Sequence, residues 1–184
     1  MSKNSSQVII LCEDTQQEVF VRHFLKKAQG IGHHAVRVNK NPSGKGSGEQ
    51  FVRKQLPDQL KAIRGRAAKA KTDLIVVIDA DISTVSQIVQ KLETTCSEQH
   101  INRRQKHERV SFIIPKRNIE TWIHYLDGHE TNEESVYQKM QKESDCKSAV
   151  DLLCRLCSTQ KTPDDFPDSL QTACLEYKRV ARDE

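Results

Sequence analysis

Three carboxylates follow two strongly apolar segments of this chain, and they are the residues best suited to chemistry. Leu74–Ile78 is an uninterrupted apolar run that is followed by Asp79 and Asp81. An earlier apolar run, Val8–Cys12, is followed by Glu13. Such runs predict buried parallel strands, and ligands of open parallel sheets gather at the carboxyl ends of the strands. The three acids are therefore expected at one sheet edge, where a bound cation or proton would offset their repulsion.

Magnesium or manganese is the cation that these donors favour. Mg²⁺ prefers carboxylate oxygens and keeps several waters when it holds a phosphate substrate. Glu18, about one turn into the helical pattern after Glu13, is a further candidate ligand. In an alternative interpretation, Asp79 only ends its strand and Asp81 caps the next helix. The predicted metal ligands are Glu13, Glu18, Asp79 and Asp81.

Strand and helix patterns alternate along the first 128 residues. This order predicts an α/β fold with a parallel sheet and helices on both faces. The acids converge only if the first strand lies beside the third, which is the common order in doubly wound sheets. Pro57 is expected to kink or restart the second helix. The expected strands span residues 7–12, 34–39, 73–79 and 110–114, and the expected helices span 15–29, 49–69 and 85–99.

The pattern changes to helices alone after Pro115. We expect residues 1–128 to form the α/β core and residues 129–184 to form a C-terminal helical extension packed on it. Polar and Pro-containing stretches mark the joints of this extension. The helices expected after the last strand lie near residues 118–126, 133–142, 146–157 and 168–181.

The two acidic strand ends resemble the Toprim domain of topoisomerases, bacterial primases and small bacterial nucleases. Glu13 matches the glutamate of that family, and Asp79 and Asp81 match its Asp-x-Asp. The segment 13–18 is similar to the Glu-Gly-x-Thr-Glu opening of stand-alone Toprim-like proteins, although Asp14 stands where Gly is usual and the second Glu comes one residue later. The resemblance covers roughly residues 6–127. It implies a Toprim-like Rossmannoid three-layer sandwich with a mainly parallel four-stranded sheet.

The same resemblance implies a metal-dependent nuclease that cleaves phosphodiester bonds in nucleic acid. The lone Trp122 is expected to be a core anchor. Glu120-x-Trp122 is similar to a Glu-x-Trp near the metal edge of the bacterial nucleases, and this resemblance implies that Glu120 is a further site acid; the alternative is an exposed helix carboxylate. Glu13 would be a metal ligand or base, and Lys116 or Arg117 would stabilise charge on the phosphorane. Because related nucleases act beside ATPases in antiphage defence, a separately encoded ATPase partner is expected.

Basic residues offer contacts for a nucleic acid backbone. Two of them follow the fourth expected strand at the acidic edge, and two precede it at the opposite end. Another lies in the Gly-rich segment 39–48, whose backbone N–H groups could cradle phosphate. That segment lacks the first Gly and the Ser or Thr of a Walker motif, so no ATPase is predicted. Solvated surface is the alternative for every run. The candidates are Lys45, Arg103, Arg104, Lys116 and Arg117.

Two other function classes stay open. Asp79-x-Asp81-x-Ser83 is similar to the Asp-x-Asp-x-Thr of haloacid dehalogenase-like phosphatases, where the first Asp is the nucleophile. That motif normally ends a first strand, whereas here it follows an earlier βαβα pattern. The other alternative is a catalytically silent Toprim-like module that binds nucleic acid or an ATPase partner.

Composition sets the remaining expectations. A chain of 184 residues with a net charge of +4 suits one compact unit and allows nucleic acid as a partner without demanding it. No apolar run approaches the roughly 20 residues of a membrane span, and the N-terminus has no signal-peptide core, so a cytoplasmic protein is expected. In a reducing cytosol its six cysteines should be free thiols or metal ligands. The apolar helical pattern disfavours a zinc site built from Cys146, Cys154, Cys157 and Cys174.

Overall fold

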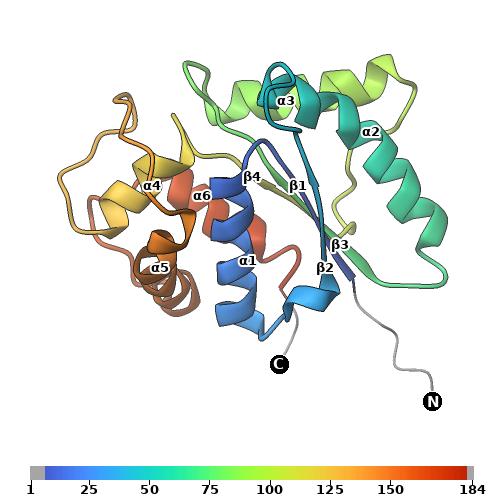
Figure 1. Ribbon diagram of the computed structural model, residues 1–184. Helices are drawn as coiled ribbons and strands as arrows, with labels where there is room; N and C mark the ends of the chain where they lie inside the picture. The colour runs from blue at the N-terminus through green and yellow to red at the C-terminus, as the bar shows by residue number, and fades with distance from the viewer. Residues whose placement is uncertain (1–6, 182–184) are drawn as a thin grey trace.

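The computed structural model describes residues 7–181, and four parallel strands form its centre (Figure 1). The strands lie in the order β2-β1-β3-β4, so the first strand does lie between the second and the third. The predicted α/β fold with a parallel sheet is therefore confirmed. The strands are β1 (Gln7–Cys12), β2 (Val36–Lys40), β3 (Thr72–Val77) and β4 (Val110–Ile113).

Helices cover both faces of the sheet and give three layers (Figure 1). Successive side chains of β1 point to opposite faces, because strands have a side-chain period of two. Val8 and Ile10 pack under the helices of one face, and Ile9 and Leu11 pack under those of the other. One face carries α2 (Gly48–Arg66) and α3 (Val85–Glu98), and the other carries α1 (Thr15–Gln29), α4 (Ile119–Leu126), α5 (Lys147–Thr159) and α6 (Asp168–Tyr177).

The C-terminal helices belong to the same hydrophobic core as the sheet. Leu153 of α5 and Leu170 of α6 are buried in one cluster with Ile75 of β3. Trp122 of α4 is 1% exposed, and its indole N–H donates to the Ser169 hydroxyl over 2.7 Å, which confirms its predicted place in the core. A boundary near residue 128 stays a prediction. None of the helices in the described chain has the length and hydropathy that crossing a membrane requires.

Residues 133–142 do not form the predicted helix, and that expectation was wrong. The segment is irregular up to the short 3₁₀ helix η2 (Glu143–Cys146). The Asn132 side chain accepts hydrogen bonds from the amides of Glu134 (3.0 Å) and Ser135 (2.8 Å). This Asx turn orders residues 132–135 locally, but no helix continues from it. The last helix also ends early, at Tyr177.

Pro57 does not restart α2, which runs unbroken from Gly48 to Arg66. A proline inside a helix costs about 3 kcal/mol because it removes one hydrogen bond and crowds the preceding turn. Leu56 and Leu60 flank it and are fully buried against the sheet. Tertiary burial of this helix face therefore outweighs the local cost.

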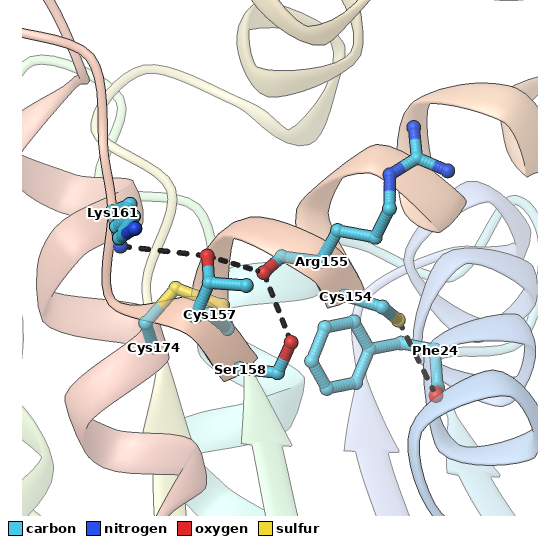
Figure 2. The surroundings of a disulfide bond; sticks show 8 residues. Phe24, Cys154, Arg155, Cys157, Ser158, Lys161 and Cys174 are labelled. Carbon is cyan, nitrogen blue, oxygen red and sulfur yellow. Dashed lines mark hydrogen bonds between the residues drawn. A yellow bond between two sulfur atoms is a disulfide. The ribbon is translucent and has the colours of Figure 1, made fainter.

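Two of the six cysteines form a disulfide, which corrects the expectation of free thiols or metal ligands for this pair. Cys157 of α5 is bonded to Cys174 of α6 (Figure 2). Their Cα atoms lie 5.2 Å apart, within the usual range for a disulfide. The other four cysteines are free thiols, namely Cys12, Cys96, Cys146 and Cys154.

A thiol titration tests this pairing. We expect the denatured, unreduced protein to react with four equivalents of a thiol reagent, and with six after reduction. Cys174→Ser is the control, because it releases Cys157 and should leave all five remaining thiols reactive without reduction. Six reactive thiols in unreduced wild-type protein would show that the bond does not form.

Candidate acidic site at the carboxyl edge of the sheet

Glu13 and Asp79 meet at the carboxyl edge of the sheet. Glu13 follows β1 and Asp79 follows β3, and these two strands are paired. The Glu13 carboxylate accepts a hydrogen bond from the Asp79 amide over 2.6 Å. The Glu13 amide donates to Gln17 Oε1 (2.9 Å), and the Gln17 amide donates to Asp14 Oδ1 (2.9 Å), which caps α1. The structure thus brings two of the predicted site acids into one hydrogen-bonded unit.

Both carboxyl groups hold their protons more tightly than usual. Burial raises the pKa of Glu13 to about 7, and the charges of Asp81 and Asp14 add to this rise, while the Asp79 amide opposes it. Burial and then the charge of Glu13 raise the pKa of Asp79 well above its ordinary range, with further contributions from Asp14 and Glu120. Burial and the neighbouring carboxylates therefore both oppose ionisation of this pair.

Glu120 joins this cluster from the first turn of α4. It is 4% exposed, and burial raises its pKa, followed by the charge of Asp14. Glu120 Oε1 and Asp79 Oδ1 are buried without a hydrogen-bond partner among the described residues. Leaving a buried polar atom unpaired costs about 1–3 kcal/mol, so such atoms call for a functional reason.

Asp81 lies at the exposed rim of the cluster. Its backbone has a φ of 50°, and its amide donates to the carbonyl of Arg117, whose φ is 83°. Left-handed conformations of non-glycine residues cost roughly 1–3 kcal/mol and cluster at functional sites. The alternative that Asp81 caps the next helix is wrong, because Thr84 is the N-cap of α3 and accepts a hydrogen bond from the Gln87 amide.

Glu18 is engaged elsewhere, contrary to its predicted role as a metal ligand. Its Oε1 pairs with Arg22 Nε (3.0 Å), and its Oε2 pairs with Lys40 Nζ (2.8 Å). Burial alone would raise the pKa of Glu18, but the hydrogen bonds from Lys40 and Arg22 hold it below its ordinary value. Both oxygens are therefore already neutralised by cations of α1 and β2.

The Gly-rich segment packs its last glycine against Glu13. A Cβ atom on Gly48 would lie 2.6 Å from Glu13 Oε2 and 2.7 Å from Glu13 Cβ. Real Cβ atoms essentially never approach other atoms so closely, so position 48 requires glycine. Lys45 of the same segment is exposed, and its side chain forms no hydrogen bond or ion pair with another described residue. The structure thus gives this segment a packing role that its glycine content alone did not specify.

The predicted basic contacts divide into two groups. Lys116 is mostly buried and pairs with Glu134 over 3.2 Å, and Arg117 Nε is buried without an acceptor in the described part of the chain. Arg103 is 69% exposed and pairs with Glu93. The first two follow β4 at the acidic edge, whereas Arg103 precedes β4 at the opposite end of the strand.

Arg104 is withdrawn from the predicted nucleic-acid surface. Its guanidinium pairs with the Glu176 carboxylate through both terminal nitrogens, and lies 3.8 Å from the centre of the Phe112 ring. It also donates to the Val110 carbonyl. Arg104 therefore joins α6 to β4 and is not free to contact a ligand.

Sequence reasoning missed four residues around the cluster. Asp14 and Gln17 lie beside Glu13 and Asp79, and Gly48 packs on Glu13. Lys139 Nζ lies 3.9 Å from Asp14 Oδ2. The positive charge of Lys139 also lowers the pKa of Glu120 and so offsets part of the increase that burial causes. Asp14 had a visible signal, because an acid directly before a helix is a typical N-cap. Lys139 had none, since it sits in a segment predicted to be helical.

The cluster has the donors for a hard divalent cation, because carboxylate oxygens bind Mg²⁺ and Mn²⁺ and two buried oxygens lack a partner. Among residues 7–181, however, no three His, Cys, Asp or Glu side chains gather so as to hold a metal ion. One oxygen of Glu13 is held by the Asp79 amide, and Asp81 lies at the rim. The residues that would hold an ion after a change of side-chain rotamer are Glu13, Asp79 and Asp81.

Comparisons with protein-family models, with curated proteins and with solved structures found no match for this chain.

Proposed function

We propose that this chain is a metal-dependent nuclease that uses Mg²⁺ or Mn²⁺ to cleave phosphodiester bonds in nucleic acid. The observation that carries the proposal is the pair Glu13 and Asp79, in contact at the carboxyl edge of a parallel sheet with raised pKa values. Strongly perturbed carboxyl groups at such an edge are typical of functional sites. A cytoplasmic location, an antiphage role and an ATPase partner belong to the same proposal through the Toprim resemblance.

Each residue has a role that follows from its surroundings. A bound ion would supply Lewis-acid stabilisation of the phosphoryl group and of the attacking water. The pKa of Glu13 lies at about 7, which suits proton transfer at neutral pH. Lys116 follows the adjacent strand β4 and is the cation placed to stabilise charge on the phosphate, once the phosphate replaces its exposed partner Glu134. The charge of Glu120 contributes to the raised pKa of Asp79.

The phosphatase alternative is weakened by the surroundings of Asp79. An aspartate nucleophile must be ionised and must reach the phosphorus atom. Here one oxygen of Asp79 is buried, and burial raises the pKa of Asp79 well above its ordinary range. The buried oxygen is not free to attack a phosphorus atom at the exposed edge of the sheet, which weakens the nucleophile role.

An activity assay tests the proposal. We expect the full chain to cleave at least one of plasmid DNA, single-stranded DNA and tRNA with Mg²⁺ or Mn²⁺, and to lose this activity with a chelator. Asp81→Asn should lower cleavage by about 100-fold or more, because it removes a charge from the site without filling the core. Asp58→Asn is the matched control, since Asp58 is exposed on α2 and its side chain forms no hydrogen bond or ion pair with a described residue.

Further measurements separate the nuclease from the phosphatase and from the silent binding module. Calorimetric titration should show Mn²⁺ binding to wild type and none to Asp79→Ala. Equal Mn²⁺ binding by both proteins would contradict the assignment of Asp79 as a metal ligand. A beryllium fluoride adduct on Asp79, seen by intact-mass analysis, would favour the phosphatase instead. Metal-independent nucleic-acid binding without cleavage of any substrate would favour the silent binding module.

A further inference from the structure

A pocket rich in basic side chains lies on the α1 face of the molecule and shares no residue with the acidic cluster. Its volume is about 200 Å³. It is formed by α1, by the short 3₁₀ helix η1 (His33–Ala35) with β2, and by the first residue of α5. The ribbons of α1 and of η1 with β2 lie next to each other in Figure 1. Buried Ile31 and Val36 line it, together with the basic residues Arg22, His23, Lys26, His33 and Lys147.

The charges around this pocket do not balance. No carboxylate lines it. Glu18 pairs with Arg22, and Asp151 pairs with His23 over 3.1 Å. Lys26 and Lys147 form no ion pair with any residue in the range 7–181. Both lysines are exposed, so their ammonium groups are free to bind an anion that enters the pocket.

The arginine of the pocket is held in place before any ligand arrives. Glu18 accepts from Arg22 Nε (3.0 Å), and the Arg22 Nη1 atom lies 3.2 Å from His33 Nδ1. A guanidinium fixed in this way loses little conformational entropy when its remaining N–H groups bind an oxyanion. The volume is below the roughly 300–1,000 Å³ of pockets for larger ligands, so only a small anion or one group of a larger molecule fits.

We propose that this pocket binds a phosphate group, carried either by a small phosphorylated molecule or by the end of a nucleic acid strand. A phosphate carries up to two negative charges and three strong acceptor oxygens, which match the unpaired lysines and the fixed guanidinium. A single carboxylate would leave part of the positive charge unneutralised. The binding does not depend on the proposed nuclease activity.

Calorimetric titration with inorganic phosphate and pyrophosphate at low salt tests the pocket. We expect Lys26→Gln/Lys147→Gln to raise the dissociation constant at least tenfold, because the variant removes both ammonium groups that would bind the phosphate oxygens. Lys54→Gln/Lys61→Gln is the charge-matched control. Both of its lysines are exposed on α2, on the opposite face of the sheet. The control should bind like wild type.

Two oligonucleotides of identical sequence, with and without a 5′-phosphate, separate the two sources. Tighter binding of the phosphorylated strand, lost in Lys26→Gln/Lys147→Gln, assigns the pocket to a strand end; binding of pyrophosphate alone assigns it to a small molecule. If circular dichroism shows that the double variant is unfolded, Arg22→Lys replaces it. This substitution keeps the positive charge but removes the planar guanidinium that can bind two phosphate oxygens at once. Equal weakening in the pocket variant and in the control would overturn the proposal, as would no binding of any phosphate probe at millimolar concentration.

Discussion

Glu13→Gln is expected to stabilise the protein at pH 8 by about 3 kcal/mol. The folded state raises the pKa of Glu13 from 4.5 to about 7, so it holds the proton more tightly than the unfolded chain does. The stability that this group contributes is present below about pH 4.5 and is lost as the pH rises to 7. At about 1.4 kcal/mol for each pH unit, the loss reaches about 3 kcal/mol. Glutamine cannot ionise, yet it keeps an oxygen for the Asp79 amide.

Urea unfolding at pH 5 and pH 8 measures this effect. Wild type should lose stability between these values, and Glu13→Gln should lose less, although Asp79 still titrates. Glu18→Gln is the matched control with the opposite sign, because Lys40 and Arg22 lower the pKa of Glu18 despite its burial. Its ion pairs stabilise the fold above the unfolded pKa, so this variant should be less stable than wild type at pH 8. Destabilisation by Glu13→Gln at pH 8 would contradict the prediction.

The same substitution separates stability from function. If Glu13 transfers a proton or binds the ion, Glu13→Gln should lose metal-dependent cleavage while gaining stability. Strained or charged active sites commonly show this exchange of stability for activity. A variant that is both more stable and fully active would mean that Glu13 has no part in the chemistry.

Gly48→Ala should destabilise the protein by roughly 1–3 kcal/mol, the usual cost of forcing an extra carbon into a packed site. The new Cβ would lie 2.7 Å from Glu13 Cβ and 2.6 Å from Glu13 Oε2. The carboxylate can rotate away, but the Glu13 Cβ is fixed by the backbone at the end of β1. The first turn of α2 must therefore shift, and Glu13 should lose its hydrogen bond to the Asp79 amide.

Gly65→Ala is the control in the same helix. A Cβ at that position meets nothing within 4 Å, and alanine favours helix over glycine by about 1 kcal/mol. Urea unfolding should therefore show opposite signs for the two substitutions. Cleavage and Mn²⁺ binding should fall only in Gly48→Ala. Equal stability of the two variants would show that the segment before α2 yields freely and does not support Glu13.

The sequence determined the arrangement of the sheet and the meeting of Glu13 with Asp79. Long apolar runs such as Leu74–Ile78 are buried because they cannot be solvated, and the βα alternation makes their strands parallel. Once β1 and β3 are neighbours, the residue after each strand must lie at the same edge. Trp122 was predictable for the same reason, since a large apolar side chain in a helical pattern packs inward.

Only the tertiary structure decided which charged and polar groups pair. Glu18 has the same local pattern as a site acid, but Lys40 at the end of β2 and Arg22 neutralise it. Arg104 looks like a surface cation until Glu176 of α6 packs against it. The Cys157–Cys174 bond and the contact of Gly48 with Glu13 likewise depend on helix positions. Apolar burial follows from residue type and spacing, whereas an ion pair or a close contact depends on a partner that the fold brings from a distant segment.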